Sequence, residues 1–208
     1  MADWNKVQWV YSAGSHEELA KRYDEWAVDY DSDLERDFGW NGHEVGVETF
    51  VKYVSTDARV IDVGVGTGLA GWELVKRGFS LLDGFDLSQG MLDVAKGKGW
   101  YRALQIGILG ENLGYPDDQY DAAIATGVFS VGHAPASGFD EVVRIVKSGG
   151  YFVITLRPDI YEANGFKAKE QDLAAAGKLQ VVEVTDSQPL LAKGEPDIQH
   201  QVRVYRVL

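Results

Sequence analysis

Hydrophobic and polar positions change period several times along the chain and predict alternating strands and helices. Apolar runs typical of buried strands occupy residues 59–65, 80–88, 102–109, 120–129 and 150–157. The stretches between them carry apolar residues at helical spacing and predict helices at 68–78, 89–99 and 137–150. Strands and helices that alternate in this way form a parallel sheet with helices on both faces.

The end of the chain departs from this alternation. After a helix at 166–178, the strands at 179–191 and 200–208 follow each other directly, so we expect an antiparallel hairpin with a long loop. The result is an α/β fold with a doubly wound, seven-stranded sheet that is mostly parallel. No linker divides the 208 residues, so we expect one domain over 1–208. The first 56 residues are rich in polar and aromatic side chains and predict a helical cap at 1–56, which leaves a core at 57–208.

Charge and the absence of cysteine narrow the chemistry. The formal net charge is −12 and the pI is near 4.7, so we expect no nucleic-acid partner, because such binding needs Lys and Arg against phosphates. Without cysteine there is no thiolate nucleophile, Cys-ligated zinc or iron–sulfur cluster, and we expect no metal. No run of eighteen apolar residues occurs and charges interrupt the first thirty, so we expect a cytoplasmic protein with no membrane partner.

A glycine-dense turn follows the strand at 59–65. From Gly66, GTGLAG satisfies G-x-G-x-x-G and Asp86 lies about twenty residues on, the pattern of a dinucleotide site. From Gly64, DVGVGTG gives G-x-G-x-G after a strand-end acid, which suits a ligand close to the backbone. A turn that binds nothing is the third interpretation. The segment GFDLSQGMLDVAK favours the second register, because Asp86 then accepts ribose hydroxyls and Leu87 and Met91 offer apolar surface to a flat base.

Together these motifs resemble the class I S-adenosylmethionine-dependent methyltransferases, which join D-x-G-x-G-T-G to xDxSxxML. The stretches at 110–129 and 141–157 resemble the same family, with Ser148 where Pro is usual. Within the class, YDxWAxxYDxD, GTGL…RGF and GxDxSxGML resemble the Williams–Beuren syndrome chromosome region methyltransferase-like proteins. The resemblance implies a Rossmann-like fold, S-adenosylmethionine as cofactor and S-adenosylhomocysteine as product.

The resemblance also implies a role for each motif residue. Asp62 faces the methionine ammonium through water, and Asp86 holds the ribose hydroxyls. The methionine and ribose approach the turn residues Gly64, Gly66, Thr67 and Gly68. Adenine lies among Leu87, Met91, Leu109, Gly110 and Glu111, and the transferred methyl lies beside Thr126, Gly127 and Val128. Many relatives carry an acid where Leu109 stands, so the adenine amino group is recognised by the backbone or by Glu111 instead.

The stretch RYDEWAVDYDSDL places Tyr23, Ala27 and Tyr30 on one helical face, with Trp26 beside them. By pattern alone this is a helix packed on the core. Its YDxxAxxYD arrangement resembles the lid helix that covers the methionine end of the cofactor in small-molecule methyltransferases of this class. The resemblance therefore adds Tyr23, Trp26 and Tyr30 to the cofactor residues.

The acceptor residues are sought after strands four and five, where the resemblance places substrate. Methyl transfer needs alignment above all, and a general base only when the acceptor loses a proton. His133 is the candidate base, with a plain surface histidine as the alternative. Arg157 either pairs with an acidic substrate group or is a surface arginine. We expect substrate to contact Phe129, His133, Arg157 and Tyr161.

The predicted function is methyl transfer to a small molecule. Cytosine C5 and arsenic methylation use cysteines, which the chain lacks, and the Asn/Asp-Pro-Pro-Tyr run of nucleic-acid amino methylation is absent. Two alternatives are an NAD-type oxidoreductase, which the tail hairpin disfavours, and a cofactor-binding module without turnover. Oxygen, nitrogen and carbon acceptors stay open, as does the oligomeric state.

Overall fold

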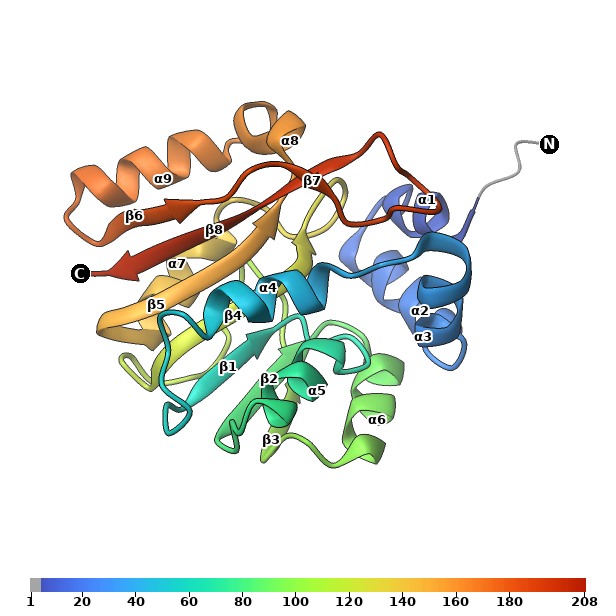
Figure 1. Cartoon of the computed structure of the whole chain (residues 1–208), viewed down its shortest axis with the longest axis horizontal. Helices are drawn as coiled ribbons and strands as arrows, with labels where there is room; N and C mark the ends of the chain where they lie inside the picture. The colour runs from blue at the N-terminus through green and yellow to red at the C-terminus, as the bar shows by residue number, and fades with distance from the viewer. Residues whose placement is uncertain (1–4) are drawn as a thin grey trace.

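The structure, a computed structural model, describes residues 5–208, with helices on both faces of one sheet (Figure 1). The strands are β1 (Val60–Val63), β2 (Leu82–Asp86), β3 (Ala103–Ile106), β4 (Tyr120–Phe129), β5 (Val146–Leu156), β6 (Leu179–Val184), β7 (Gln188–Pro189) and β8 (Gln199–Val207). Seven of them run in the order β3-β2-β1-β4-β5-β8-β6, and the short β7 pairs with β8 at the side. The first five are parallel, whereas β8 is antiparallel to both β5 and β6. The predicted sheet and its C-terminal hairpin are confirmed.

The helices that cover the sheet are α4 (Gly42–Phe50), α5 (Leu69–Lys76), α6 (Gln89–Lys98), α7 (Gly138–Ile145), α8 (Pro158–Ala163) and α9 (Phe166–Ala175). Local signals begin and end them. The Ser88 hydroxyl accepts from the N–H of Met91 and caps α6, and Gly99 ends that helix with a φ of 73°. The helix expected at 137–150 ends at Ile145, because Val146 already has extended backbone and pairs with Tyr120 of β4.

Before the sheet, the chain forms α1 (Lys6–Tyr11), α2 (His16–Trp26), α3 (Tyr30–Asp33) and the π-helical turn η1 (Leu34–Phe38). These elements share a small core of their own, which includes Val7, Leu19 and Trp26. Helix α4 instead packs on the sheet beside α5. We therefore use the name cap for residues 5–38.

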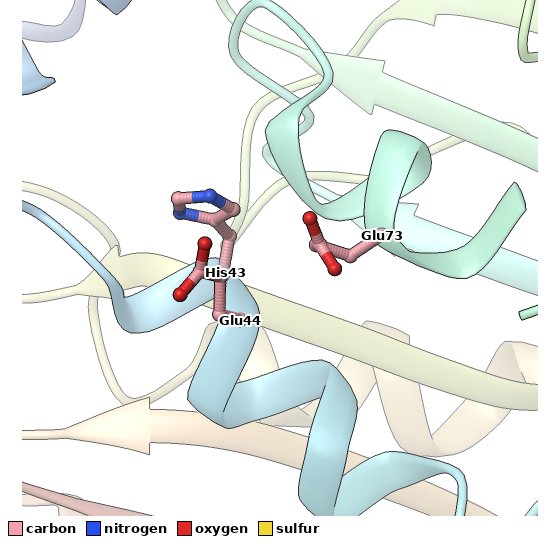
Figure 2. Close-up of side chains that lie close together, drawn as sticks. All are labelled: His43, Glu44 and Glu73. Atoms are coloured by element: carbon pink, nitrogen blue, oxygen red, sulfur yellow. The ribbon is translucent and has the colours of Figure 1, made fainter. Parts of the chain in front are cut away.

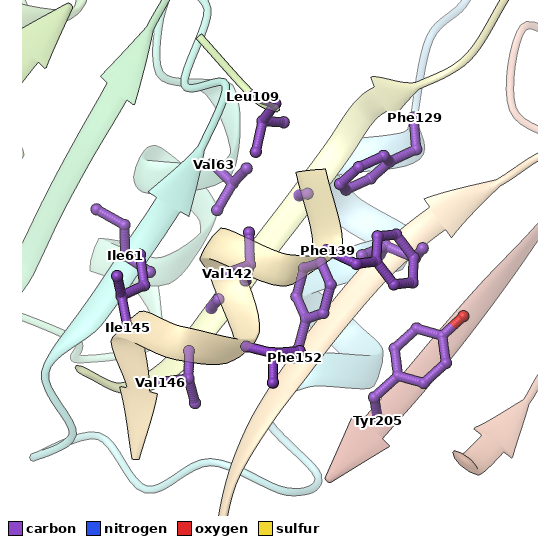
Figure 3. Packing of buried hydrophobic residues seen from close by; sticks show 14 of the residues in the cluster. Ile61, Val63, Leu109, Phe129, Phe139, Val142, Ile145, Val146, Phe152 and Tyr205 are labelled. Carbon is purple, nitrogen blue, oxygen red and sulfur yellow. The ribbon is translucent and has the colours of Figure 1, made fainter. Parts of the chain in front are cut away.

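Two apolar layers hold the sheet between its helices. On one face, strand residues such as Phe152 pack against Phe139 and Val142 of α7 (Figure 3). On the other face, Val60 and Leu82 pack against α4 and α5. The cap lies at the edge where the parallel strands β1, β2 and β4 end (Figure 1). None of the helices described between residues 5 and 208 has the length and apolarity needed to cross a membrane.

Candidate functional site

A cavity lies between the cap and the carboxyl ends of β1, β2 and β4. The empty space within it, including the part open to solvent, is about 700 Å³. We call it the main cavity. It is lined by His16, Leu19, Tyr23, Tyr30, Gly64, Gly66, Phe85, Asp86, Leu87, Met91, Gly107, Ile108, Leu109, Thr126, Gly127, Val128, His133 and Ala134.

The glycine-rich turn brings backbone to the cavity surface. Gly64 and Gly66 have φ angles of 67° and 52°, in the left-handed region that side chains disfavour. A Cβ on Gly64 would lie 2.6 Å from Cγ2 of Val128, so that position is closed to any side chain. A Cβ on Gly66 would meet nothing within 4 Å, so its backbone is open to a ligand. Gly68 faces the Tyr101 ring instead of the cavity.

Asp86 ends β2 and joins the two turns of the site. Its Oδ2 accepts from the N–H of Gly66 at 2.8 Å, and its Oδ1 accepts from the N–H of Ser88 at 2.9 Å. Burial raises the pKa of Asp86 to about 6, although these N–H groups act to lower it. The carboxylate still has free lone pairs at the cavity wall, where two hydroxyl donors can reach it.

Asp62 lies beneath the glycine turn and is 1% exposed, so it is behind the cavity wall. Its Oδ2 accepts from the hydroxyl of Tyr101 at 2.6 Å. Burial raises the pKa of this carboxyl to about 7. Tyr101 lies in the loop after α6, where no local pattern indicates this role.

The far end of the cavity is an apolar slot. Of the residues expected around adenine, Leu87, Met91 and Leu109 line this slot, whereas Gly110 and Glu111 are exposed and lie outside the lining. Three residues in the lining of this slot were not predicted. Phe85 and Ile108 belong to apolar runs typical of a core, and Gly107 carries no local signal.

The cap covers the other end of the cavity with Tyr23 and Tyr30, whose ring centroids are 6.2 Å apart. Trp26 turns away and its Nε1 donates to Oδ2 of Asp33 at 2.9 Å. It packs in the core of the cap and does not line the main cavity. His16 and Leu19, from the start of α2, line the cavity in addition.

Two carboxylates tie the cap to the turns of the site. Asp24 of α2 accepts from the Ser88 hydroxyl at 2.6 Å and from the N–H of Gly90 at 2.7 Å. Asp31 of α3 accepts from the hydroxyl of Thr67, in the glycine turn, and pairs with Lys98 at 2.6 Å. The helical pattern of residues 22–34 gives no sign of these contacts, because their partners lie far along the chain. The cap is thus held by the same two turns that shape the cavity.

His133 follows β4 and lines the cavity as a neutral ring. Its Nδ1 lies 2.9 Å from the carbonyl of Val131, which can only accept, so Nδ1 carries the hydrogen. Its Nε2 therefore accepts from the hydroxyl of Tyr23 at 2.6 Å. Burial lowers the pKa of His133 to about 4. The pair is uncharged at neutral pH, and the lone pair of Nε2 is engaged by the Tyr23 hydroxyl.

A second cavity adjoins the first, and its empty space, including the part open to solvent, is about 510 Å³. We call it the inner cavity. Its wall toward the main cavity is formed by Tyr23, Tyr30 and Gly127, which line both spaces. Its other lining residues are Val7, Val10, Tyr11, Trp26, Leu34, Trp40, Phe129, Ser130, Thr155, Leu191 and His200.

The predicted substrate residues separate in space. Phe129 lines the inner cavity, and Arg157 lines an outer hollow beside Tyr11, where it pairs with Asp159 at 2.6 Å. Tyr161 lies in neither place, because its hydroxyl donates to Glu170 at 2.7 Å near α9. Of the four residues, the main cavity receives only His133.

One group of possible metal ligands occurs among residues 5–208, on α4 and α5 (Figure 2). Ligand atoms of His43, Glu44 and Glu73 lie within 4.8 Å of one another. The carboxylate of Glu73 already pairs with Lys76 and with Arg77. Because those two cations occupy the oxygens of the buried Glu73, the group is an ion-pair cluster and supports no metal site.

The residues of the main cavity fit the cofactor expected from the sequence. An open backbone at Gly66, a buried carboxylate at Asp86 and an apolar slot at Leu87 and Met91 match a charged chain, a ribose and a flat base in that order. The slot has no acid where Leu109 stands, so backbone groups are left to meet the edge of the base.

Comparisons with known proteins agree with this fit. Residues 61–154 match a family model described as a methyltransferase domain. The human methyltransferase-like protein 27 is 34% identical over 65% of this chain, which spans 56% of that relative's length. The uncharacterized methyltransferase YdaC of Bacillus subtilis (strain 168) is 30% identical over 57% of this chain and 70% of its own length. The solved [4+2]-cyclase SpnF shares the fold, with a TM-score of 0.67 at 15% identity over 93% of this chain and 97% of that one.

Proposed function

Because the chain belongs to the class I S-adenosylmethionine-dependent methyltransferases, we propose that it transfers a methyl group to a small-molecule acceptor. The observation that carries the proposal is the pair of adjoining cavities. The main cavity has the groups expected to bind the cofactor, and Tyr23, Tyr30 and Gly127 also line a second cavity beside it, whose wall is largely apolar.

The likeness to the Williams–Beuren syndrome chromosome region methyltransferase-like proteins supports a finer placement of the chain within the class. It rests on the cap motif YDxWAxxYDxD and on GxDxSxGML. In the structure these motifs contribute Tyr23, Tyr30, Asp86 and Met91 to one cavity. The small-molecule acceptor is also consistent with the net charge of −12, which disfavours nucleic acid.

When bound, S-adenosylmethionine supplies an electrophilic methyl group on a sulfonium. The chain's own part is to hold the reactants in line and to keep water out. Asp86 orients the ribose, the open backbone at Gly66 receives the methionine chain, and Tyr23 and Tyr30 close the methyl end. Where the acceptor is a hydroxyl or an N–H group, Tyr23 relays its proton to Nε2 of neutral His133.

Calorimetry and a labelling assay test this function. We expect saturable binding of S-adenosylmethionine and S-adenosylhomocysteine but not of NAD, and transfer of labelled methyl to metabolites of a cell extract. His133→Ala should lower turnover by about a hundredfold, because proton transfer by a placed base contributes at least that much, and should leave S-adenosylhomocysteine affinity unchanged.

Three results would contradict the proposal in different ways. Binding of NAD alone would support the oxidoreductase. Binding of the adenosyl compounds with no methylated product in any extract would support a module without turnover. Label confined to tRNA or histone would refute a small-molecule acceptor, and full activity of His133→Ala would remove His133 from the mechanism.

A further inference from the structure

The inner cavity has the walls of a binding site for a flat, uncharged molecule. Most of its surface consists of aromatic and aliphatic side chains, including Tyr11, Trp40 and Phe129. No Asp, Glu, Lys or Arg occurs among the described residues that line it, so a charged ligand would lose its hydration without gaining an ion pair. Flat rings pack well against such aromatic walls.

Its position suits an acceptor. The inner cavity meets the main cavity at Gly127, Tyr23 and Tyr30, which is the end where the methyl group is expected. On its other side, Tyr11 also lines the outer hollow, which opens to solvent beside Arg157. The three spaces are thus neighbours in a row from the surface to the main cavity, with Tyr11 at the boundary of the outer two.

One polar side chain in this apolar wall lacks a partner. His200, at the start of β8, is 6% exposed, and its buried Nδ1 has no hydrogen-bond partner within residues 5–208. The Trp40 ring stands edge-on to it, with the ring centroids 6.1 Å apart. A buried polar atom of this kind is normally satisfied, so one left unpaired at a cavity wall points to a ligand group.

The chemistry of the ring decides what that group is. Burial, and after it the positive charge of Arg157, lower the pKa of His200 to about 4, so the ring is neutral at neutral pH. A neutral imidazole carries one hydrogen, on either ring nitrogen, so the unpaired Nδ1 needs a partner such as a hydroxyl group, which can both donate and accept a hydrogen bond.

We propose that the inner cavity is the acceptor site and that Nδ1 of His200 forms a hydrogen bond with a hydroxyl group on a flat, uncharged aromatic acceptor. This proposal rests on the proposed function. It makes His200 a specificity residue, which positions the acceptor while Tyr23 and His133 serve the reacting end.

Calorimetry on the full chain saturated with S-adenosylhomocysteine tests the site, since the main cavity is then filled. The probes are 2-naphthol, naphthalene, which lacks the hydroxyl, and 2-naphthoate, which carries a charge. We expect 2-naphthol to bind roughly tenfold more tightly than naphthalene, as a hydrogen bond to an otherwise unpaired buried atom provides. We expect no measurable binding of 2-naphthoate.

Variants of His200 and His43 separate ligand recognition from an effect on folding. His200→Leu should abolish the preference for 2-naphthol over naphthalene, whereas His200→Gln, which keeps an acceptor, should retain part of it. His43→Leu is the matched control, because His43 also has a buried, unpartnered Nδ1 but lines neither cavity. It should leave the preference unchanged. If His200→Leu does not fold, the affinities of the wild type for 2-naphthol and naphthalene, and those of His200→Gln, still test the proposal.

Several outcomes would overturn the inference. They are equal binding of 2-naphthol and naphthalene to the wild type, a full preference kept in His200→Leu, and binding of 2-naphthoate. If S-adenosylhomocysteine binds but 2-naphthol does not, the inference fails and the proposed function stands. If S-adenosylhomocysteine itself does not bind, the proposed function fails.

Discussion

Two carboxylates three positions apart in β2 have different tasks. Asp86 accepts backbone N–H groups from both turns of the site and lines the main cavity. Asp83 leaves the opposite face of the strand, where it pairs with Arg59 at 2.7 Å and accepts from the Tyr120 hydroxyl at 3.3 Å. Both are buried, so burial alone does not tell a binding acid from a structural one.

A matched pair of substitutions separates these tasks. Asp86→Asn replaces one charged acceptor of the ribose hydroxyls and should weaken S-adenosylhomocysteine binding by about 1.5 to 3 kcal/mol, measured by calorimetry. Asp83→Asn should leave that affinity unchanged and lower the melting temperature instead, because Arg59 loses its partner. Equal losses of affinity in both variants would show that Asp86 has no direct part in binding.

At the scale of elements, the cap depends on contacts that come from distant parts of the chain. Its core is small. Its attachment to the sheet edge includes a hydrogen bond between Asp24 and Ser88 at the start of α6, and one between Asp31 and Thr67 of the glycine turn. A ligand that orders these turns therefore stabilises the cap as well. We expect cap opening and cofactor binding to be linked.

Hydrogen exchange measures this link. S-adenosylhomocysteine should slow exchange in residues 23–30 more than in β5. Asp24→Ala removes the acceptor of the Ser88 hydroxyl and the Gly90 N–H, so exchange in α2 should quicken while β5 keeps its protection. Asp29→Ala is the control, because Asp29 is exposed and makes only a 3.7 Å contact with Lys6. Uniform protection along the chain, or equal effects of both variants, would indicate that the cap is simply core.

For the whole molecule, the free energy of unfolding depends on pH through buried acids. The pKa of Asp62 is about 7 in the folded protein against an ordinary value of 3.8. Between these two values the native state holds a proton that the unfolded chain has released, so this group lowers the free energy of unfolding as pH rises. The contribution is largest below pH 4 and is lost by about pH 7, where the folded carboxyl ionises.

Urea unfolding at pH 5 and pH 8 tests this contribution. Asp62→Asn removes the titration and keeps an oxygen that accepts from Tyr101, so the variant should lose less stability than the wild type between these pH values. The difference should be on the order of 2 kcal/mol, at about 1.4 kcal/mol for each pKa unit. The exposed Asp197→Asn should follow the wild type. An identical pH dependence of Asp62→Asn and the wild type would refute the raised pKa.

Local patterns determined much of the architecture, because they are written in neighbouring residues. Apolar periodicity located the strands, and turn chemistry placed Gly64, Gly66 and Asp86 at a sheet edge that the structure confirms. A helix end was misplaced at 137–150, since β5 captures Val146 through pairing with β4, a contact that no local pattern records.

The tertiary structure decided what depends on distant residues. His133 meets Tyr23 across 110 positions, Asp24 reaches Ser88 across 64, and His200 lies in an aromatic cavity formed largely by the cap and by β4. Phe129, Arg157 and Tyr161 looked equivalent along the chain but face three different environments. The sequence alone thus determined the fold and the position of the glycine turn, because spacing and residue type suffice for both. Folding decided which side chains share a cavity, because partners there are chosen by packing between elements and not by their order.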